Sequence, residues 1–298
     1  MDKNKPKMKQ TVIQLMHPGR EPSIESGSPS WVVPSNFEEH KRKFLCTPGT
    51  YAVKNPEGSG FIESSEASKL VFWGEWEQPS QATAFLPPHG EGYPKAWHEP
   101  TLPTTPLTKA PGTMPSCAVS PCTDGFHPNT DPFVFTPGFF YSRCRIKPEN
   151  RLSRLQPGDL VVFCSFVNDH MVFDTVFVVK RLLKLEDAQR ECDLLQSAVG
   201  KTGFSANGDC MLYKGANFEN LGDQMFSFFP AKIFQPLDSI PRFCRPRVPA
   251  RLISNSGFSG GNLQSFKIIK AASAYDIWKA LVQATLDQDL VLGLGASL

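Results

Sequence analysis

Several signatures that would identify a function are absent from this sequence of 298 residues. It contains no GxSxG, HExxH or protein-kinase motif, and its glycine-rich stretch 256–262 lacks the Gly-Lys-Ser/Thr of a phosphate-binding loop. Gly293 and Gly295 have no helix-forming stretch after them, so we do not interpret them as a dinucleotide fingerprint. No run reaches the ~20 apolar residues that a membrane-spanning helix needs. These absences exclude the most recognisable hydrolase, kinase and membrane classes.

Strong net charge and paired cysteines are also missing. The formal net charge is +2, which is too small to indicate nucleic-acid binding by bulk electrostatics, so such a function would depend on local clusters. The 8 cysteines include no CxxC pair, which favours reduced thiols over disulfides. The polar, basic start MDKNKPKMKQ has no apolar segment of signal-peptide length behind it. We therefore expect a cytoplasmic protein with no membrane partner and no cofactor.

The composition predicts one folded unit behind a flexible start. Residues 1–44 combine lysines with a Pro/Ser stretch and predict a flexible N-terminal arm. Hydrophobic residues make up 40% of the chain, enough for a core, so we expect residues 45–298 to form a single α+β domain. Many of the 27 prolines lie in Pro79–Pro115, which predicts a long irregular loop with sparse regular structure. Because long loops in compact domains commonly bind something, we expect Pro79–Pro132 to form one wall of a site.

The most informative segment is 151–180. Leu160–Phe166 and Met171–Val179 are almost wholly apolar and rich in β-branched and aromatic residues, as in strands that are covered on both faces. Asn168, Asp169 and His170 supply the turn of a predicted antiparallel hairpin, which is preceded by a tight Pro157-Gly158-Asp159 turn.

Further elements follow from periodicity and turn residues. We expect a helix within Lys180–Val199, because apolar residues recur there at spacings of three and four. A last helix is predicted at Ser273–Leu286, where Ser273 and Asp276 form a capping box. Additional strands are expected at Lys69–Glu75, Met211–Tyr213, Gln224–Phe229 and, as the final strand, Lys267–Lys270.

The run Phe72-Trp73-Gly74-Glu75-Trp76-Glu77 places two tryptophans beside two carboxylates. In a strand, Trp73, Glu75 and Glu77 face one side, opposite to Phe72 and Trp76. A tryptophan beside carboxylates can clamp a base, since the ring stacks on it and a carboxylate accepts from an exocyclic amine. The alternative is a core strand with solvated glutamates.

Other polar residues offer weaker candidates. Asp174 lies within an apolar strand, so it either pairs with an arginine or faces a ligand cavity. Asn129 and Asp131 end a run rich in turn formers that either lines a pocket or folds the loop on itself. Four potential zinc ligands occur in this region, but their spacing matches neither a finger nor a ribbon, so we predict no metal site: Cys117, Cys122, His127 and Cys144.

Two groups of basic residues provide local positive charge. Guanidinium groups suit phosphate oxygens, and an adjacent Phe140 or Tyr141 offers a stacking ring, although solvated surface residues are an equal alternative. The first group is Arg143, Arg145, Lys147, Arg151 and Arg154, and the second is Arg242, Arg245, Arg247 and Arg251.

The segment from Tyr141 through Arg151 to Pro157-Gly158-Asp159-Leu160-Val161-Val162-Phe163, with the return strand to Val179, resembles PUA-like domains of the EVE and ASCH type. With Asp124-Gly125-Phe126-His127-Pro128-Asn129 before it, it also resembles nucleotide-modification-associated domains. The resemblance covers about a quarter of the chain. It implies a mixed sheet or small β-barrel flanked by helices, with a pocket for a base or nucleotide.

Together these observations predict an α+β, PUA-like protein with long Pro-rich loops that binds nucleic acid or a nucleotide and recognises, or helps to make, a modified base. The alternatives are a nucleotide-modifying transferase or hydrolase, and a protein-interaction scaffold that uses the Pro-rich loop. We expect Trp73, Glu75, Tyr141 and Asp174 to approach one another around a cavity. The catalytic candidates are Glu75, Glu77, Asp131 and Asp174. The ligand-binding candidates are Trp73, Trp76, Asn129, Tyr141, Arg143, Arg145, Arg151 and Lys214.

Overall fold

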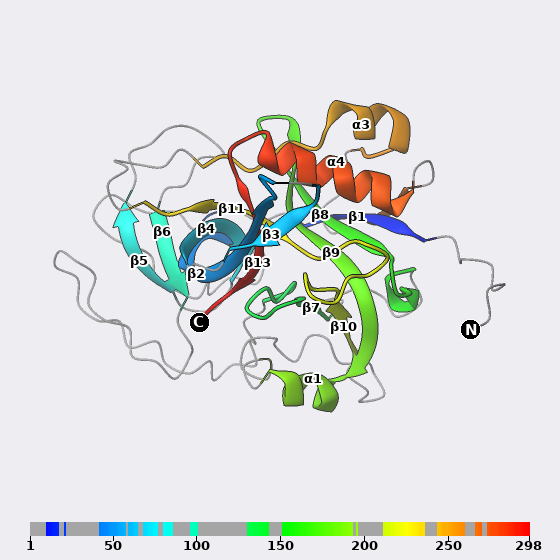
Figure 1. Cartoon of the computed structure of the whole chain (residues 1–298), viewed down its shortest axis with the longest axis horizontal. Coiled ribbons are helices and arrows are strands. Elements are labelled where there is room, and N and C mark those ends of the chain that lie inside the picture. The colour runs from blue at the N-terminus through cyan, green and yellow to red at the C-terminus, as the bar shows by residue number, and fades with distance from the viewer. Residues whose placement is uncertain are drawn as a thin grey trace.

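A computed structural model gives the fold. It describes residues 10–17, 21, 42–57, 59–64, 68–76, 80–85, 96–100, 130–142, 151–192, 195, 211–235, 243–259, 266–269 and 273–298. Within these ranges the chain forms an α+β fold in which two β-sheets predominate (Figure 1).

The first sheet contains six strands and is built around the predicted hairpin. Its order is β12 (Phe266–Ile269), β1 (Val12–Met16), β8 (Leu160–Val167), β9 (His170–Lys184), β10 (Met211–Gly215) and β7 (Phe140–Tyr141). Because β8 and β9 are central, both of their faces are covered, which agrees with their apolar composition.

The β8–β9 hairpin confirms the predicted antiparallel pair, although His170, predicted in the turn, is the first residue of β9. The strands are antiparallel, with Leu160 opposite Val178 and Val167 opposite His170. Asn168 and Asp169 both have positive φ, as a two-residue hairpin turn with the right twist requires. At the other end of β8, Gly158 has φ +86° and Asp159 Oδ2 accepts from the Gln156 N–H, which closes the tight turn.

The predicted arm of residues 1–44 contains a packed strand, so that prediction is wrong at Val12–Met16. This strand, β1, is buried along its length and lies parallel to β8 and antiparallel to β12. Asp159 Oδ1 accepts from the Thr11 N–H at 2.7 Å and fixes the start of the strand. The apolar run VIQLM therefore outweighs its basic, Pro/Ser-rich surroundings.

The second sheet contains seven strands: β13 (Val291–Ala296), β11 (Phe229–Ile233), β4 (Ser68–Glu75), β2 (Arg42–Lys54), β6 (Ala96–Pro100), β5 (Ser80–Phe85) and β3 (Phe61–Glu63). The long strand β2 pairs with β4 through its first half and with β13 and β3 through its second. Since β4 also pairs with β11, and β11 with β13, these four strands make a closed circuit of antiparallel pairings.

Two further predictions need correction here. The Pro-rich segment 79–115 was expected to be a long irregular loop with little regular structure, but β5 and β6 lie within it and form an antiparallel pair. The final strand is β13 rather than β12, so the Gly-Leu-Gly sequence at 293–295 is part of a strand. Gly293 is required there, because a Cβ at this position would lie 2.2 Å from the ring of Phe229.

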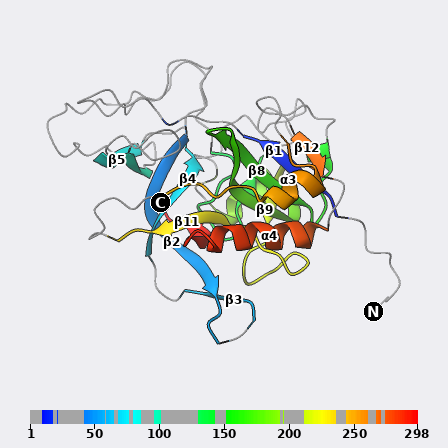
Figure 2. The ribbon, with the colours of Figure 1, turned by 90° about the horizontal axis from the view of Figure 1, so that it is seen from above.

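Three α-helices occur in the described part of the chain. α1 (Leu185–Glu191) is shorter than predicted, because β9 continues to Lys184 and takes the first residues of the expected helix. α3 (Ala250–Ser256) and α4 (Ala274–Leu286) lie near each other (Figures 1 and 2), and in Figure 1 they are on the opposite side of the molecule from α1. The Ser273 hydroxyl accepts from the Asp276 N–H, which confirms the predicted cap.

The strand predicted at Gln224–Phe229 begins only at Phe229, because Gln224 has positive φ and lies in a turn. A 3-10 helix at Arg151–Arg154 precedes the hairpin.

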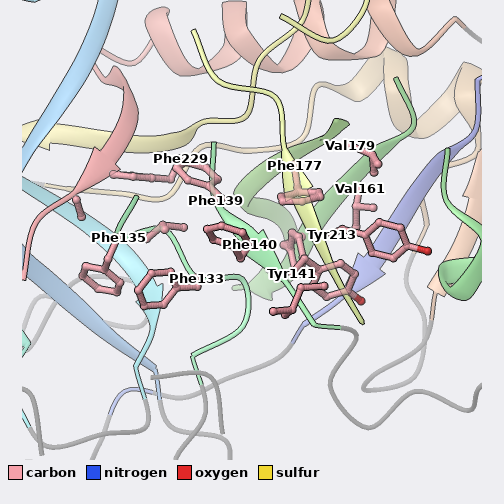
Figure 3. Close-up of a cluster of buried hydrophobic side chains, with 14 of the residues drawn as sticks. Phe133, Phe135, Phe139, Phe140, Tyr141, Val161, Phe177, Val179, Tyr213 and Phe229 are labelled. Carbon is pink, nitrogen blue, oxygen red and sulfur yellow. The ribbon is translucent and has the colours of Figure 1, made fainter. Parts of the chain in front are cut away.

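The two sheets share their hydrophobic cores. One buried cluster joins Phe72 and Phe229 of the second sheet to Phe163 and Phe177 of the first. Figure 3 shows part of this cluster, with rings from 133–141 and from several strands packed together. No helix among the described residues is long and apolar enough to span a membrane.

Candidate functional site: a buried ionic cluster

The two faces of β4 have different surroundings. Leu70, Phe72 and Trp76 point into the shared apolar core. The alternate residues Trp73 and Glu75 point to the other side, as alternation predicts. We call the first side the core face. The second side carries the cluster described next.

Glu75 is held in a buried ionic triad. Its Oε2 atom lies 2.7 Å from Arg42 Nη2 and 2.9 Å from His17 Nε2. Arg42 is directly opposite Glu75 in the β2–β4 register, so strand pairing itself brings the two charges together. His17 follows β1 immediately and arrives from the other sheet.

Trp73 leads to a second buried pair. The guanidinium of Arg245 lies over the Trp73 ring, with Cζ 4.4 Å from the ring centroid. Arg245 Nη1 donates to Asp174 Oδ1 at 3.2 Å and to the Ser165 hydroxyl at 2.7 Å, and that hydroxyl donates to Asp174 Oδ2. Of the two alternatives for Asp174, pairing with an arginine is confirmed. Arg245 belongs to the second predicted basic group, but it lies inside the protein.

The two ion pairs form one connected cluster, because they are linked both through β4 and through β8 of the first sheet. On β4, Trp73 and Glu75 are two residues apart on one face. On the first sheet, the His17 N–H donates to the Cys164 carbonyl, and the next residue, Ser165, is the one that contacts both Asp174 and Arg245. We call this set the ionic cluster: His17, Arg42, Trp73, Glu75, Ser165, Asp174 and Arg245.

The ionic cluster is buried except at one point. Arg42, Trp73, Glu75, Asp174 and Arg245 are each at most 6% exposed, whereas the His17 side chain is 16% exposed. An aromatic group that includes Phe44, Trp97 and Phe243 borders the cluster beside Trp73. Among the described members of the cluster, His17 therefore provides the approach from solvent.

The cluster is also balanced in charge. Arg42 and Arg245 carry two positive charges, and Glu75 and Asp174 carry two negative ones. Protonation of His17 would add one further charge. In each pair, the attraction between the opposite charges offsets the free-energy cost of removing them from water. Such a pair nevertheless adds little net stability compared with apolar residues of the same size.

Four predicted site residues lie elsewhere. Tyr141 packs its ring against Phe163 and Phe177 in the core, so it does not join the predicted group with Trp73, Glu75 and Asp174 (Figure 3). Trp76 is fully buried on the core face beside Phe135. The carboxylate of Asp131 accepts from the N–H and the hydroxyl of Ser142, which makes it a clamp within its loop.

Lys214 pairs with Glu191 near the surface and lies over the Phe140 ring. Glu191 also pairs with Arg181, so Lys214 belongs to a surface ion network.

The remaining predicted residues fall outside the described residues. These are Glu77, Asn129, Arg143 and Arg145, together with Cys117, Cys122, His127 and Cys144; for Arg151 the backbone is described and the side chain is not. In the part of the chain that is described, no group of three or more His, Cys, Asp or Glu residues is arranged to hold a metal ion.

Sequence reasoning missed His17, Arg42 and Ser165. His17 and Arg42 fall within the predicted arm, and Ser165 reads as part of an apolar strand. The available signal was indirect: a buried carboxylate such as Glu75 or Asp174 needs polar or cationic partners, but the sequence does not show which residues these are.

Titratable groups beside the cluster are affected by burial. Desolvation and the charge of Lys43 lower the pKa of His98 to about 3, and its Nδ1 atom lies 3.2 Å from the Ser80 hydroxyl. Burial raises the pKa of Cys46 to about 11 and raises that of Cys164 well above its usual value. His98 is therefore neutral and both thiols are protonated at pH 7.

The chain was compared with family models, curated proteins and solved structures, and none of them matches it.

Proposed function

We propose that this protein is a nucleotide- or nucleic-acid-binding protein of PUA-like type, and that it recognises a base at the ionic cluster. The observation that carries the proposal is the pair of arginine–carboxylate contacts around the Trp73 indole on one buried face of β4. The face supplies an aromatic ring, hydrogen-bond donors and hydrogen-bond acceptors, which are the three elements of base recognition.

Stability alone is a weak reason for this arrangement. Well-packed apolar residues commonly replace buried ion pairs without loss of stability. The core face of the same strand is buried by apolar residues, so this strand can be packed without ion pairs. The presence of two buried ion pairs on the opposite side therefore favours a binding role.

The charge balance favours a neutral ligand over an anion. Each guanidinium already faces a carboxylate, so a phosphate placed here would gain little net attraction. A neutral base can accept from N–H groups and donate an amine to a carboxylate without changing the charge of the site. Phosphate contacts in a nucleic acid would then come from Arg143, Arg145 and Arg151, as the sequence predicts.

The fold is compatible with the PUA-like part of the proposal. Its basis is the hairpin after the Gly158-Asp159 turn, the closed circuit of β2, β4, β11 and β13, and helices on either side. A barrel flanked by helices is what the resemblance implies.

Calorimetry with nucleosides tests base recognition directly. Binding should be almost independent of salt between 50 and 200 mM, because no net charge is neutralised. Glu75→Gln should weaken it by ~10-fold, since the base then donates to a neutral amide oxygen instead of a carboxylate. The matched control is Glu99→Gln, because Glu99 pairs with Lys69 on the same sheet and both side chains are partly exposed. Absence of nucleoside binding, or equal binding by Glu75→Gln and wild type, would contradict the proposal.

Fluorescence anisotropy with labelled single-stranded DNA and RNA tests the phosphate contacts. Replacement of Arg143, Arg145 and Arg151 by alanine should lower the log–log salt slope by ~0.7 to 0.9 for each lost contact. Circular dichroism of each variant checks that the fold is retained. An unchanged slope would show that these arginines do not contact phosphate. Base recognition would then be tested by the nucleoside experiment alone.

A second candidate is a nucleotide-modifying enzyme that uses the same residues for proton transfer. The observation that favours it is the contact of 2.9 Å between His17 Nε2 and Glu75 Oε2, because a carboxylate commonly orients a catalytic histidine. Incubation with nucleotides, followed by mass spectrometry, should then reveal a product, and His17→Gln should abolish it while binding remains. Binding without any product would favour the first proposal.

A further inference from the structure

Three N–H donors of the ionic cluster have no acceptor among the described residues. They are Trp73 Nε1, Arg42 Nε and Arg245 Nε, and all three atoms are buried. Buried donors are satisfied in the great majority of protein structures, so each unpaired one calls for an explanation. Three on neighbouring side chains indicate a shared acceptor.

The three donors belong to one region of the β2–β4 pair. Arg42 is opposite Glu75, and Phe44 is opposite Trp73, so Arg42 and Trp73 are diagonal neighbours with a typical Cβ separation of ~7–8 Å. The Arg245 guanidinium lies directly over the Trp73 ring. A ligand that contacts all three donors must therefore lie between Arg42 and Trp73 on this face and beside Arg245.

Acceptor capacity remains on the same face. Asp174 accepts from Arg245 and from Ser165. An ionised carboxylate offers about four acceptor sites, so Asp174 can accept from an additional donor. The ligand must therefore present mainly acceptors to Trp73 and the arginines, and donors elsewhere on its rim.

We infer that the recognised base is a 6-oxopurine such as guanine, and this inference rests on the proposed function. The O6 and N7 atoms of a 6-oxopurine are adjacent acceptors, which suits N–H donors. Adenine presents an N6 amine at that edge, so donors would face donors and buried N–H groups would stay unpaired. Cytosine also places an amine donor in its major-groove pattern, and thymine offers one carbonyl beside a methyl group.

Calorimetry with a panel of 5′-monophosphates tests the inference. Guanosine and inosine nucleotides should bind within ~3-fold of each other, because both have O6 and N7. The adenosine nucleotide should bind at least ~10-fold more weakly, as should 7-deazaguanosine, which lacks the N7 acceptor.

The variant Trp73→Phe removes one donor and keeps a ring. It should reduce the preference for guanosine over adenosine by ~5- to 10-fold. Trp76→Phe on the core face is the matched control and should leave the preference unchanged. If Trp73→Phe does not fold, the nucleotide panel on the wild-type protein still tests whether the site prefers a 6-oxopurine.

The outcomes separate the inference from the proposed function. Equal binding of adenosine and guanosine nucleotides would overturn the inference while base recognition stands. Failure of every nucleotide to bind would overturn both, and the three donors would then be assigned to ordered water.

Discussion

The two faces of β4 are both buried, but they are buried by different means. On the core face, Phe72 lies 4.3 Å from the Phe229 ring, measured between centroids, within an apolar cluster that joins both sheets. On the opposite face, Trp73 lies beneath a guanidinium and Glu75 holds an arginine and a histidine. The same strand thus carries an ordinary core and an ionic cluster.

The comparison shows that burial alone does not identify a role. Apolar burial lowers the free energy of the folded state by about 25 cal/mol per Å². Burial of an ion pair is close to neutral, because the loss of hydration offsets most of the attraction. The core face therefore accounts for stability, and the ionic cluster is the better candidate for function.

The largest expected effect is a change in the free energy of unfolding when the Arg245–Asp174 pair is broken and then replaced. Arg245→Met should lower the free energy of unfolding by about 3–5 kcal/mol, because it leaves the Asp174 carboxylate buried without its cation. Addition of Asp174→Leu should restore most or all of the loss. Urea denaturation of the single and double variants measures both.

The core face supplies the matched control. Phe72→Ala should also cost about 3–5 kcal/mol, through a cavity, but a second change at Phe229 should add to the loss. If Arg245→Met is not rescued by Asp174→Leu, the two faces do not differ in the way described.

The contrast also marks where sequence reasoning succeeds. The β8–β9 hairpin and the capped helix α4 could be predicted, because their signals are local: an Asn168-Asp169 turn and a Ser273–Asp276 cap. Alternation along β4 correctly placed Trp73 and Glu75 opposite to Phe72 and Trp76.

The ionic cluster could not be assembled in the same way, because its contacts join distant parts of the chain. Arg42 and Glu75 are 33 residues apart, and Arg245 and Asp174 are 71 apart. An arginine partner was one of the two alternatives that the apolar surroundings of Asp174 left open. Which arginine it is depends on how the segment from Phe243 onward pairs with the hairpin. The closed circuit of β2, β4, β11 and β13 is likewise a property of long-range pairing.

A second prediction concerns His98, a buried titratable group that forms no ion pair with a carboxylate among the described residues. His98 is opposite Leu45 in the parallel β2–β6 register, and its pKa is lowered from 6.5 to about 3, chiefly by desolvation. Below pH 6.5 the unfolded chain binds a proton that the folded protein does not. The stabilising contribution is therefore complete above pH 6.5 and is lost as the pH falls toward about 3.

Measurement against a His98→Gln variant isolates this effect. Between pH 7 and pH 5 the wild type should lose about 2 kcal/mol more unfolding free energy than the variant, at about 1.4 kcal/mol per unit below pH 6.5. Urea denaturation at several pH values gives the difference. Parallel curves for the two proteins would show that His98 gains its proton in the folded state as readily as in the unfolded chain.

The smallest expected effect compares the two tryptophans. Trp73→Phe should change the free energy of unfolding by no more than about 1 kcal/mol, because loss of ring volume is offset by removal of a buried N–H that has no acceptor among the described residues. Trp76→Phe on the core face removes part of a fully buried ring and should cost at least about 1 kcal/mol more. Urea denaturation without ligand compares them. If Trp73→Phe is the more damaging change, the indole is a structural element like Trp76, and the functional assignment of its face is contradicted.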